Sequence, residues 1–248
     1  MTLFDLTGRV ALVTGGSRGL GREMVRAFAA AGADVVIASR NLETCQQAAA
    51  EVEALGRRAL PYACHLGRWD EIPGLVDAAY DAFGKVDVLV NNAGMSPLYD
   101  SVFEVSEKLY DAVLNLNLKG PFRTCAMVGE RMVRDGGGSI INVSSTGSIR
   151  SRPPIIPYAA AKAGLNSLTE GFALALGPTV RVNTLMAGPF LTDISAAWDM
   201  EATEAAMQAH ALKRAGRPEE IVGAALYLAS DAASYTSGAT LRVDGGIP

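Results

Sequence analysis

Tyr158 and Lys162 are the two residues whose types and spacing point most directly to chemistry. They lie four positions apart, which places the phenol and the ammonium on the same face of a helix. A phenol with a pKa of about 10 is a poor base near neutrality. A positive charge ~4 Å away contributes up to ~4 kcal/mol, enough to lower that pKa by as much as ~3 units before desolvation takes some back. The pair predicts a proton donor and acceptor, although on many helices such a tyrosine only packs and such a lysine is solvated.

Histidine and cysteine offer little material for other chemistry. The chain has two histidines, His65 and His210, and no His-Glu-x-x-His spacing, which argues against a His-based zinc site or a Ser-His-Asp arrangement. Cys45, Cys64 and Cys125 are odd in number, widely separated and free of any Cys-x-x-Cys spacing, so neither a disulfide framework nor a thiolate metal site is expected. We therefore expect no metal and a catalytic acid or base other than histidine.

A glycine-rich segment, Thr-Gly-Gly-Ser-Arg-Gly-Leu-Gly, directly follows the apolar run 10–13. Glycines permit a tight turn and a close backbone approach, and the free N–H groups at the start of a helix can hold a pyrophosphate. The spacing differs from Gly-x-Gly-x-x-Gly, so a plain tight turn explains it about equally well. The residues predicted to contact a dinucleotide here are Gly15, Ser17, Arg18, Gly19, Leu20 and Gly21.

Short apolar runs alternate along the chain with longer amphipathic stretches, and this order must position those residues. The predicted strands are 10–13, 35–38, 59–63, 86–90, 139–143, 180–185 and 240–243. The predicted helices are 20–31, 42–55, 69–83, 107–134, 158–176 and 219–229. Such alternation with continuously apolar strands is typical of a parallel sheet covered by helices on both faces, with ligands beyond the C-terminal strand ends. We expect one α/β domain over 1–248, with substrate loops at about 146–157 and 187–212.

Three motifs together resemble the short-chain dehydrogenase/reductase family, including 3-oxoacyl-ACP reductase-like members and other carbonyl reductases and alcohol dehydrogenases. They are the Thr-Gly-x-x-x-Gly-x-Gly segment, the Asn-Asn-Ala-Gly segment 91–94, and Tyr-x-x-x-Lys at 158–162. The resemblance covers nearly the whole chain and includes Arg-Pro-Glu-Glu at 217–220 and Val-Asp-Gly-Gly at 243–246. It implies a Rossmann-like, doubly wound, seven-stranded parallel sheet.

The resemblance also implies a set of site residues. Ser145 stands in the position of the family's catalytic serine, and Asn117 matches a helix asparagine thought to hold a water that links the lysine to solvent. Lys162 would also bind the nicotinamide ribose, with Tyr158 beside it. Asn91, Ala93 and Gly94 would line the cofactor, and Gly188, Phe190 and Thr192 would grip the carboxamide. In this last segment Ala187 replaces the family's proline.

Two positions bear on the adenosine half of the cofactor. Arg40 stands at the end of the second predicted strand, where an Asp or Glu would bind a ribose 2′-hydroxyl. With Arg18 it could hold a 2′-phosphate, so NADP(H) is preferred and NAD(H) is possible; the alternative is that both arginines are solvated surface residues. His65, followed by Leu66, replaces the family's usual Asp near the adenine, where it either contacts the base or only fills the position.

The expected reaction is hydride transfer between NADP(H) and a small-molecule carbonyl or secondary alcohol, with Tyr158 handling the proton. The alternative is a catalytically idle sensor or scaffold that keeps the fold and the dinucleotide. Arg150 and Arg152 either attract a carboxylate or acidic carrier protein or, as loop arginines commonly do, neither. A mostly apolar pocket is expected to be bordered by Ser96, Pro97, Tyr99, the segment 149–157, Met186, Phe190 and Trp198.

Composition limits the partners. The 248 residues are 49% hydrophobic and carry a formal charge of -4, so the chain has no excess of positive charge for binding nucleic acid. The sequence has no apolar run long enough to span a bilayer and no secretory-type start. We expect a cytoplasmic protein without a membrane partner, and a homo-oligomer, tetramer or dimer, as the family resemblance implies.

Overall fold

The computed structural model describes residues 3–192, 195 and 200–248. Its centre is a seven-stranded sheet in the order β3-β2-β1-β4-β5-β6-β7, and every neighbouring pair is parallel. The strands are β1 (Val10–Thr14), β2 (Asp34–Ser39), β3 (Ala59–Ala63), β4 (Val88–Asn91), β5 (Gly138–Ser145), β6 (Val180–Ala187) and β7 (Thr240–Val243). Because all strands run the same way, their C-terminal ends meet at one edge, as the sequence predicts.

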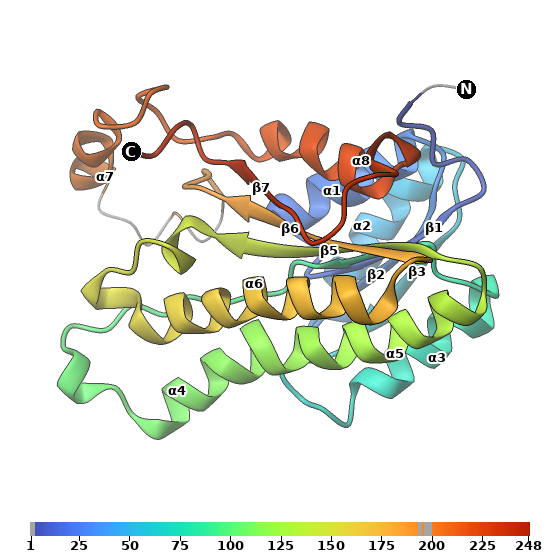
Figure 1. The fold of residues 1–248 in the computed structure, drawn as a ribbon, viewed down its shortest axis with the longest axis horizontal. Helices are drawn as coiled ribbons and strands as arrows, with labels where there is room; N and C mark the ends of the chain where they lie inside the picture. Colours follow the sequence, from blue (N-terminus) through green and yellow to red (C-terminus); the bar gives the residue numbers. More distant parts are fainter. Residues whose placement is uncertain (1–2, 193–194, 196–199) are drawn as a thin grey trace.

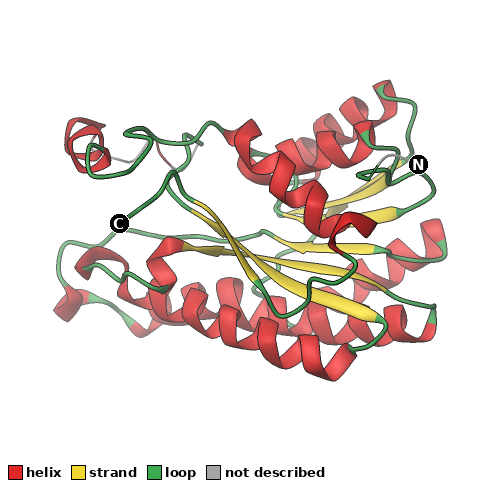
Figure 2. Ribbon diagram, turned by 45° about the horizontal axis from the view of Figure 1, so that its top comes forward, coloured by secondary structure: helices red, strands yellow, loops and turns green. Residues whose placement is uncertain are grey.

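Helices cover both faces of the sheet (Figure 1). One face carries α1 (Gly19–Ala30), α2 (Leu42–Ala54) and α8 (Val222–Ala229). The other carries α3 (Ile72–Phe83), α4 (Glu107–Leu114), α5 (Gly120–Arg134) and α6 (Ile156–Leu176). Figure 2 shows the twist of the sheet between these two layers. The chain thus forms a single Rossmann-like domain.

The strands contribute side chains to two separate cores because successive residues point to opposite faces. In β1, Ala11 and Val13 join the core under α1, α2 and α8, whereas Val10 and Leu12 join the core under α3 and α5. All five residues of β1 are buried, which explains why the strand is continuously apolar and has no polar face.

The helix expected over 107–134 is interrupted. Its two halves, α4 and α5, are joined by a π-helical turn, Asn115–Lys119, a feature that apolar periodicity alone does not reveal and that often marks functional sites. A short helix, α7 (Met200–Met207), lies within the segment expected to be a loop. Within the described part of the chain, no helix is both long and apolar enough to cross a membrane.

Candidate active site

The predicted catalytic residues lie where β5 ends and α6 begins, at the C-terminal edge of the sheet. Ser145 is the last residue of β5 and pairs with Ala187 of β6. Helix α6 starts at Ile156 with a proline in its first turn, where a missing N–H costs nothing. Tyr158 is therefore in the first turn and Lys162 one turn further, which brings both residues over the end of β5.

Lys162 is almost fully buried, with 4% of its surface exposed. Its ammonium nitrogen donates a hydrogen bond of 2.7 Å to the backbone carbonyl of Val143. Burial lowers the pKa of this amine to about 8, because an unpaired charge is disfavoured away from water. A buried lysine tethered to the end of β5 is costly to maintain, which is typical of a functional group.

The half-buried Tyr158 lies beside this lysine, whose Nζ is 5.9 Å from the centre of the phenol ring. Burial raises the pKa of Tyr158, and a hydrogen bond with Ser145 lowers it in part. The direction that we expected from the lysine charge was therefore wrong: desolvation dominates the pKa of Tyr158, and sequence spacing cannot measure it. The Ser145 hydroxyl also accepts a hydrogen bond of 3.1 Å from the N–H of Gly147, which fixes its direction.

Asn117 is fully buried in the π turn and faces the same space as Lys162. Its amide nitrogen donates to the carbonyls of Met95 and Val113, both at 2.9 Å, and its Oδ1 accepts from the N–H of Met95 at 3.3 Å. A Cβ built on Gly94 would lie 2.8 Å from this Oδ1 and 3.7 Å from the lysine nitrogen. The Asn117 oxygen keeps a second lone pair for an additional donor.

The glycine loop is shaped for close backbone approach. Gly15 has a φ of +64°, and a Cβ there would lie 2.9 Å from the Cα of Ala93. A Cβ on Gly21 would lie 2.2 Å from the carbonyl oxygen of Gly15, so only glycine fits at that point. The N–H groups at the start of α1 consequently sit next to the end of β4, and Ser17 within the loop is buried.

Asn92 and Thr14 hold this loop to β4, and neither was among the expected site residues. The Asn92 amide donates to the carbonyls of Thr14 at 3.0 Å and Gly15 at 3.1 Å. The Thr14 hydroxyl accepts from the N–H groups of Asn92 and Ala93 at 3.0 and 3.1 Å. The Asn91 side chain instead points into the core and donates to Asn142 at 2.9 Å. The alternation of strand side chains predicts that the two asparagines point in opposite directions, but it does not say which of them points into the core.

The segment after β6 returns to the glycine loop. A Cβ on Gly19 would lie 3.6 Å from the Thr192 side chain, so these two predicted cofactor contacts are neighbours. Gly188 packs against the backbone of Asp244, where a Cβ would approach to 2.6 Å. The buried ring of Phe190 packs against Gly216, so its side chain is used for packing. Leu20 packs on the core under α1.

A pocket of about 210 Å³ opens at the ends of β1 and β2. Its lining residues are Ser17, Arg18, Ser39, Arg40, Asn41 and Thr44. Arg40 is exposed at its rim, and the structure thus brings together the two arginines that the sequence suggested for a phosphate. The pocket and the glycine loop fit the phosphates of a dinucleotide. The loop offers backbone N–H donors to the negative charge, and the pocket offers the guanidinium groups of two arginines.

His65 follows β3 and is half-buried. Its ring forms a hydrogen bond within the turn that contains it. Its Nδ1 accepts a hydrogen bond of 3.1 Å from the N–H of Gly67, which leaves the proton of a neutral ring on Nε2. The backbone N–H of His65 donates to Glu71 at 2.7 Å. Leu66 is buried in the core under α3 and α5, so its side chain is not available to a ligand.

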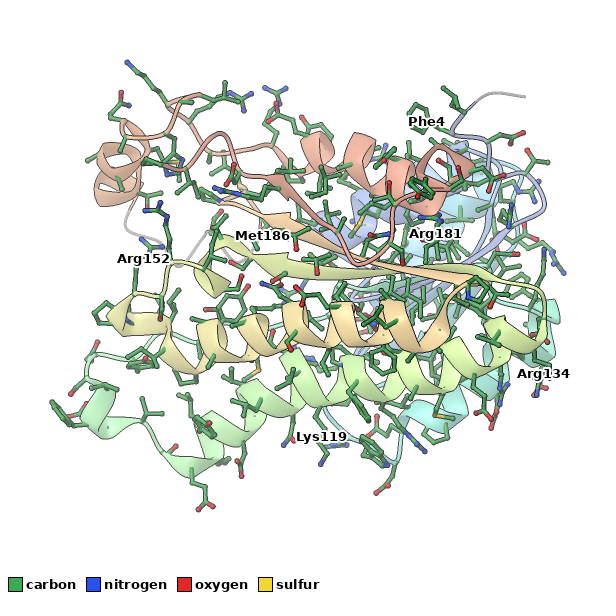
Figure 3. The ribbon with its side chains drawn as sticks, viewed as in Figure 1. Phe4, Lys119, Arg134, Arg152, Arg181 and Met186 are labelled. Atoms are coloured by element: carbon green, nitrogen blue, oxygen red, sulfur yellow. The ribbon has the colours of Figure 1, made fainter. Side chains whose placement is uncertain are left out.

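Tyr99 joins the segment after β4 to the expected substrate loop at 146–157. Its hydroxyl donates to the carbonyl of Pro153 at 2.7 Å and accepts from the N–H of Ile156 at 2.9 Å. Met186 is buried in β6, and Figure 3 shows Arg152 at the same end of the sheet. Ser96 and Pro97 lie between β4 and Tyr99 and are half-buried. Trp198 lies outside the described residues.

The chain is similar to known proteins over nearly its whole length. A family model described as Enoyl-(Acyl carrier protein) reductase matches residues 15–248. The chain is 36% identical over 244 residues to 3-oxoacyl-(acyl-carrier-protein) reductase FabG of Thermotoga maritima, an alignment that covers 98% of each chain.

Two solved structures are similar over most of their length. One, from Beutenbergia cavernae, is described as an NAD(P)-dependent gluconate 5-dehydrogenase with bound NADP; it has a TM-score of 0.93 and 34% identity, with 98% of both chains covered. The other is a 7α-hydroxysteroid dehydrogenase with NADH and 7-oxo glycochenodeoxycholic acid; it has a TM-score of 0.94 and 33% identity, covering 98% of this chain and 96% of the other. With the fold, these similarities establish that the chain belongs to the short-chain dehydrogenase/reductase family, enzymes that use a nicotinamide dinucleotide to interconvert alcohol and carbonyl groups.

Proposed function

We propose that the protein is an NADP(H)-preferring reductase of small-molecule carbonyls, with the reverse oxidation of secondary alcohols, in which Tyr158 is the general acid and base. The observation that carries the proposal is the buried Lys162, tethered to Val143 at 2.7 Å beside the Tyr158 ring. A lysine that only served solubility would lie in solvent. Its burial next to a phenol at the sheet edge suits proton chemistry.

Each residue of the site has a separate role in the proposed reaction. When bound, the nicotinamide supplies or accepts the hydride. Ser145 and Tyr158 both donate hydrogen bonds to the carbonyl oxygen, and Tyr158 passes its proton to that oxygen as negative charge develops. Since burial raises the pKa of Tyr158, the phenol is protonated near neutral pH, the form needed for reduction. Lys162 stabilises the phenolate that remains, and Asn117 accepts from a water through which the lysine exchanges protons.

The preference for NADP(H) rests on charge at the end of β2. Arg40 and Arg18 line one pocket with Ser17 and Ser39, so a 2′-phosphate would meet two guanidinium groups and two hydroxyls. No carboxylate is present among the residues that line this pocket, and therefore nothing there repels the phosphate. The similar structures described above include one with NADP and one with NADH. Membership of the family therefore does not decide between NADP(H) and NAD(H).

The substrate class follows from the loops at about 146–157 and 187–212. Acyl-carrier-protein, gluconate and steroid appear in the names of three relatives, so we assign the substrate by chemistry only. Exposed Ile149 in the first of these loops, Ile156 at the start of α6 and Leu98 after β4 are near Tyr158, which favours an apolar carbonyl over a sugar acid.

The test is a panel of aliphatic, cyclic, steroidal and sugar-acid carbonyls, followed by the loss of NADPH or NADH absorbance. We expect turnover with apolar ketones and a higher kcat/KM with NADPH. Tight NADPH binding without turnover of any compound would instead favour a sensor or scaffold. The expected cytoplasmic location and the homo-oligomer, dimer or tetramer, stay predictions; light scattering after gel filtration tests the second.

A further inference from the structure

A chain of buried polar side chains crosses the core directly beneath the site. Its members are Asn91, Thr124, Asn142, Thr169 and Thr184, each at most 2% exposed, and we call it the amide–hydroxyl network. The residues belong to β4, α5, β5, α6 and β6, respectively. Apolar side chains could fill this space without needing partners, so five matched polar groups require an explanation beyond packing.

Thr169 is the centre of the network. Its hydroxyl donates to the carbonyl of Leu165 at 3.0 Å and accepts from the Asn142 amide at 2.9 Å. The hydroxyl of Thr184 donates to the same oxygen, also at 2.9 Å. One donor and two acceptor positions are all that a hydroxyl has. The bonding capacity of Thr169 is therefore used completely, and its neighbours are held in fixed directions.

The other half of the network extends to α5. The Asn142 oxygen accepts from the Asn91 amide at 2.9 Å, and the Asn91 oxygen accepts from the Thr124 hydroxyl at 2.6 Å. Each amide thus has one orientation that satisfies its neighbours, and a flipped amide would place two donors or two acceptors together. The network fixes α5 and α6 against β4, β5 and β6.

The network lies next to the anchor of the proposed catalytic lysine. Asn142 immediately precedes Val143, whose carbonyl holds Lys162 at 2.7 Å. Thr169 follows Lys162 by seven residues in α6, which is about two helical turns and therefore the same helix face. One residue beyond Val143, the Ser144 hydroxyl donates to the Lys162 carbonyl at 3.4 Å. The bond between Asn142 and Thr169 therefore sets the position of α6 along β5 at the point from which Lys162 reaches its acceptor.

We propose that Thr169 is a positioning residue for the active site: through Asn142 it holds α6 in the register at which Lys162 bonds Val143 and lies beside Tyr158. This inference rests on the proposed catalytic role of Lys162. Lys162 is the charged group next to Tyr158 on α6. The Ser145 hydroxyl, at the end of β5, forms a hydrogen bond with the Tyr158 phenol. A shift of α6 would change both relationships together.

The test compares Thr169→Val with Thr169→Ser and a matched control. Valine keeps the shape of threonine but leaves the Asn142 amide and the Thr184 hydroxyl without an acceptor, whereas serine keeps the hydroxyl. Ser139→Ala is the control, because Ser139 is equally buried in β5 and bonds Leu228, on the other side of the sheet. Thermal unfolding, NADPH affinity by fluorescence titration, kcat, KM and the pH profile of alcohol oxidation are measured for all three.

We expect Thr169→Val to lower kcat about ten- to a hundredfold, as small misplacements of catalytic groups do. The apparent pKa in the pH profile of alcohol oxidation should rise by about 1 unit as the lysine moves away from the phenol. NADPH affinity should fall because Lys162 would lose its contact with the nicotinamide ribose. Thr169→Ser should restore all three properties, and Ser139→Ala should lower only the unfolding temperature.

Two outcomes separate the possible failures. If Thr169→Val is merely less stable, with kcat, NADPH affinity and pH profile equal to those of the parent, the network serves stability only and the inference is wrong. If the parent itself turns over no carbonyl, the proposed function fails. The affinity for NADPH then still tests the position of Lys162, because binding needs no turnover.

Discussion

The Lys162 ammonium and the Val143 carbonyl are joined by a hydrogen bond of 2.7 Å between α6 and the end of β5. A single neutral acceptor satisfies one of the three donors of an ammonium group. The same nitrogen lies 3.7 Å from the position of a Cβ built on Gly94 and 5.9 Å from the centre of the Tyr158 ring, and two of its donors have no such acceptor among the described residues. The lysine is thus fixed at one point while part of its bonding capacity is kept for ligands.

The charge on Lys162 should reduce the stability of the fold. Its pKa falls from an ordinary value of 10.5 to about 8 in the folded protein, so the unfolded chain binds the proton more tightly, and stability decreases as the pH drops through this interval. The difference corresponds to about 3 kcal/mol at neutral pH. We expect Lys162→Met to raise the free energy of unfolding at pH 7, and this gain to shrink by about 2 kcal/mol near pH 9.5. Urea unfolding at both pH values measures it; a gain independent of pH would contradict the assignment to charge.

Removing the phenol hydroxyl should eliminate turnover and leave binding intact. Tyr158→Phe keeps the ring and removes the proton donor, so kcat should fall about 10²- to 10⁴-fold, the usual contribution of general acid catalysis. The NADPH dissociation constant should stay close to that of the parent. Tyr227→Phe is the matched control, because its hydroxyl bonds Thr236 at 2.8 Å, away from the site. Steady-state kinetics that retain more than about a tenth of the parent kcat would rule out Tyr158 as the acid.

Cofactor choice should depend on Arg40. Replacing it with aspartate in the pocket shared with Arg18 removes a cation and adds a repulsive charge where the 2′-phosphate would sit. We expect Arg40→Asp to weaken NADPH binding by about 2–3 kcal/mol and NADH binding much less. Arg134→Asp, near the opposite end of the sheet in Figure 3, is the control. Fluorescence titration with both cofactors decides, and equal losses for the two would show that Arg40 does not contact the phosphate.

The glycine loop should depend on the amide of Asn92. That amide donates to the carbonyls of Thr14 and Gly15, and Asn92→Asp would set a carboxylate against two carbonyl oxygens. We expect the variant to lose about 1–3 kcal/mol of stability and most of its NADPH affinity. In stability, Asn92→Asp and Asn41→Asp should differ, because Asn41 caps α2 through its oxygen, which aspartate keeps. The comparison is limited to stability because Asn41 lines the proposed phosphate pocket. Equal behaviour of the two variants would indicate a general charge effect.

Fold and motif positions could be predicted because they follow from local patterns. Continuous apolar runs gave seven strands close to those observed, and the parallel arrangement followed from their alternation with helices. The side-chain directions of Asn91 and Asn92 could not be predicted, because the sequence does not show which residue at the end of a strand faces the core. The pKa direction of Tyr158 was also missed: spacing reports the nearby charge of Lys162, whereas the cost of burial depends on the whole surrounding structure.

The π turn at Asn115–Lys119 has a further consequence for how this chain can change in length. A π turn accommodates one residue more than an α-helical turn does, and each residue of an α-helix advances it by about 100°. Because the π turn already absorbs this extra residue, deleting it would leave α4 and α5 in nearly the same orientation and would instead rotate residues inside the turn, Asn117 among them, by up to about 100°. Asn117 could not then bond both Met95 and Val113. Natural or engineered variants of this enzyme should therefore accept single-residue deletions in surface turns but not in this one.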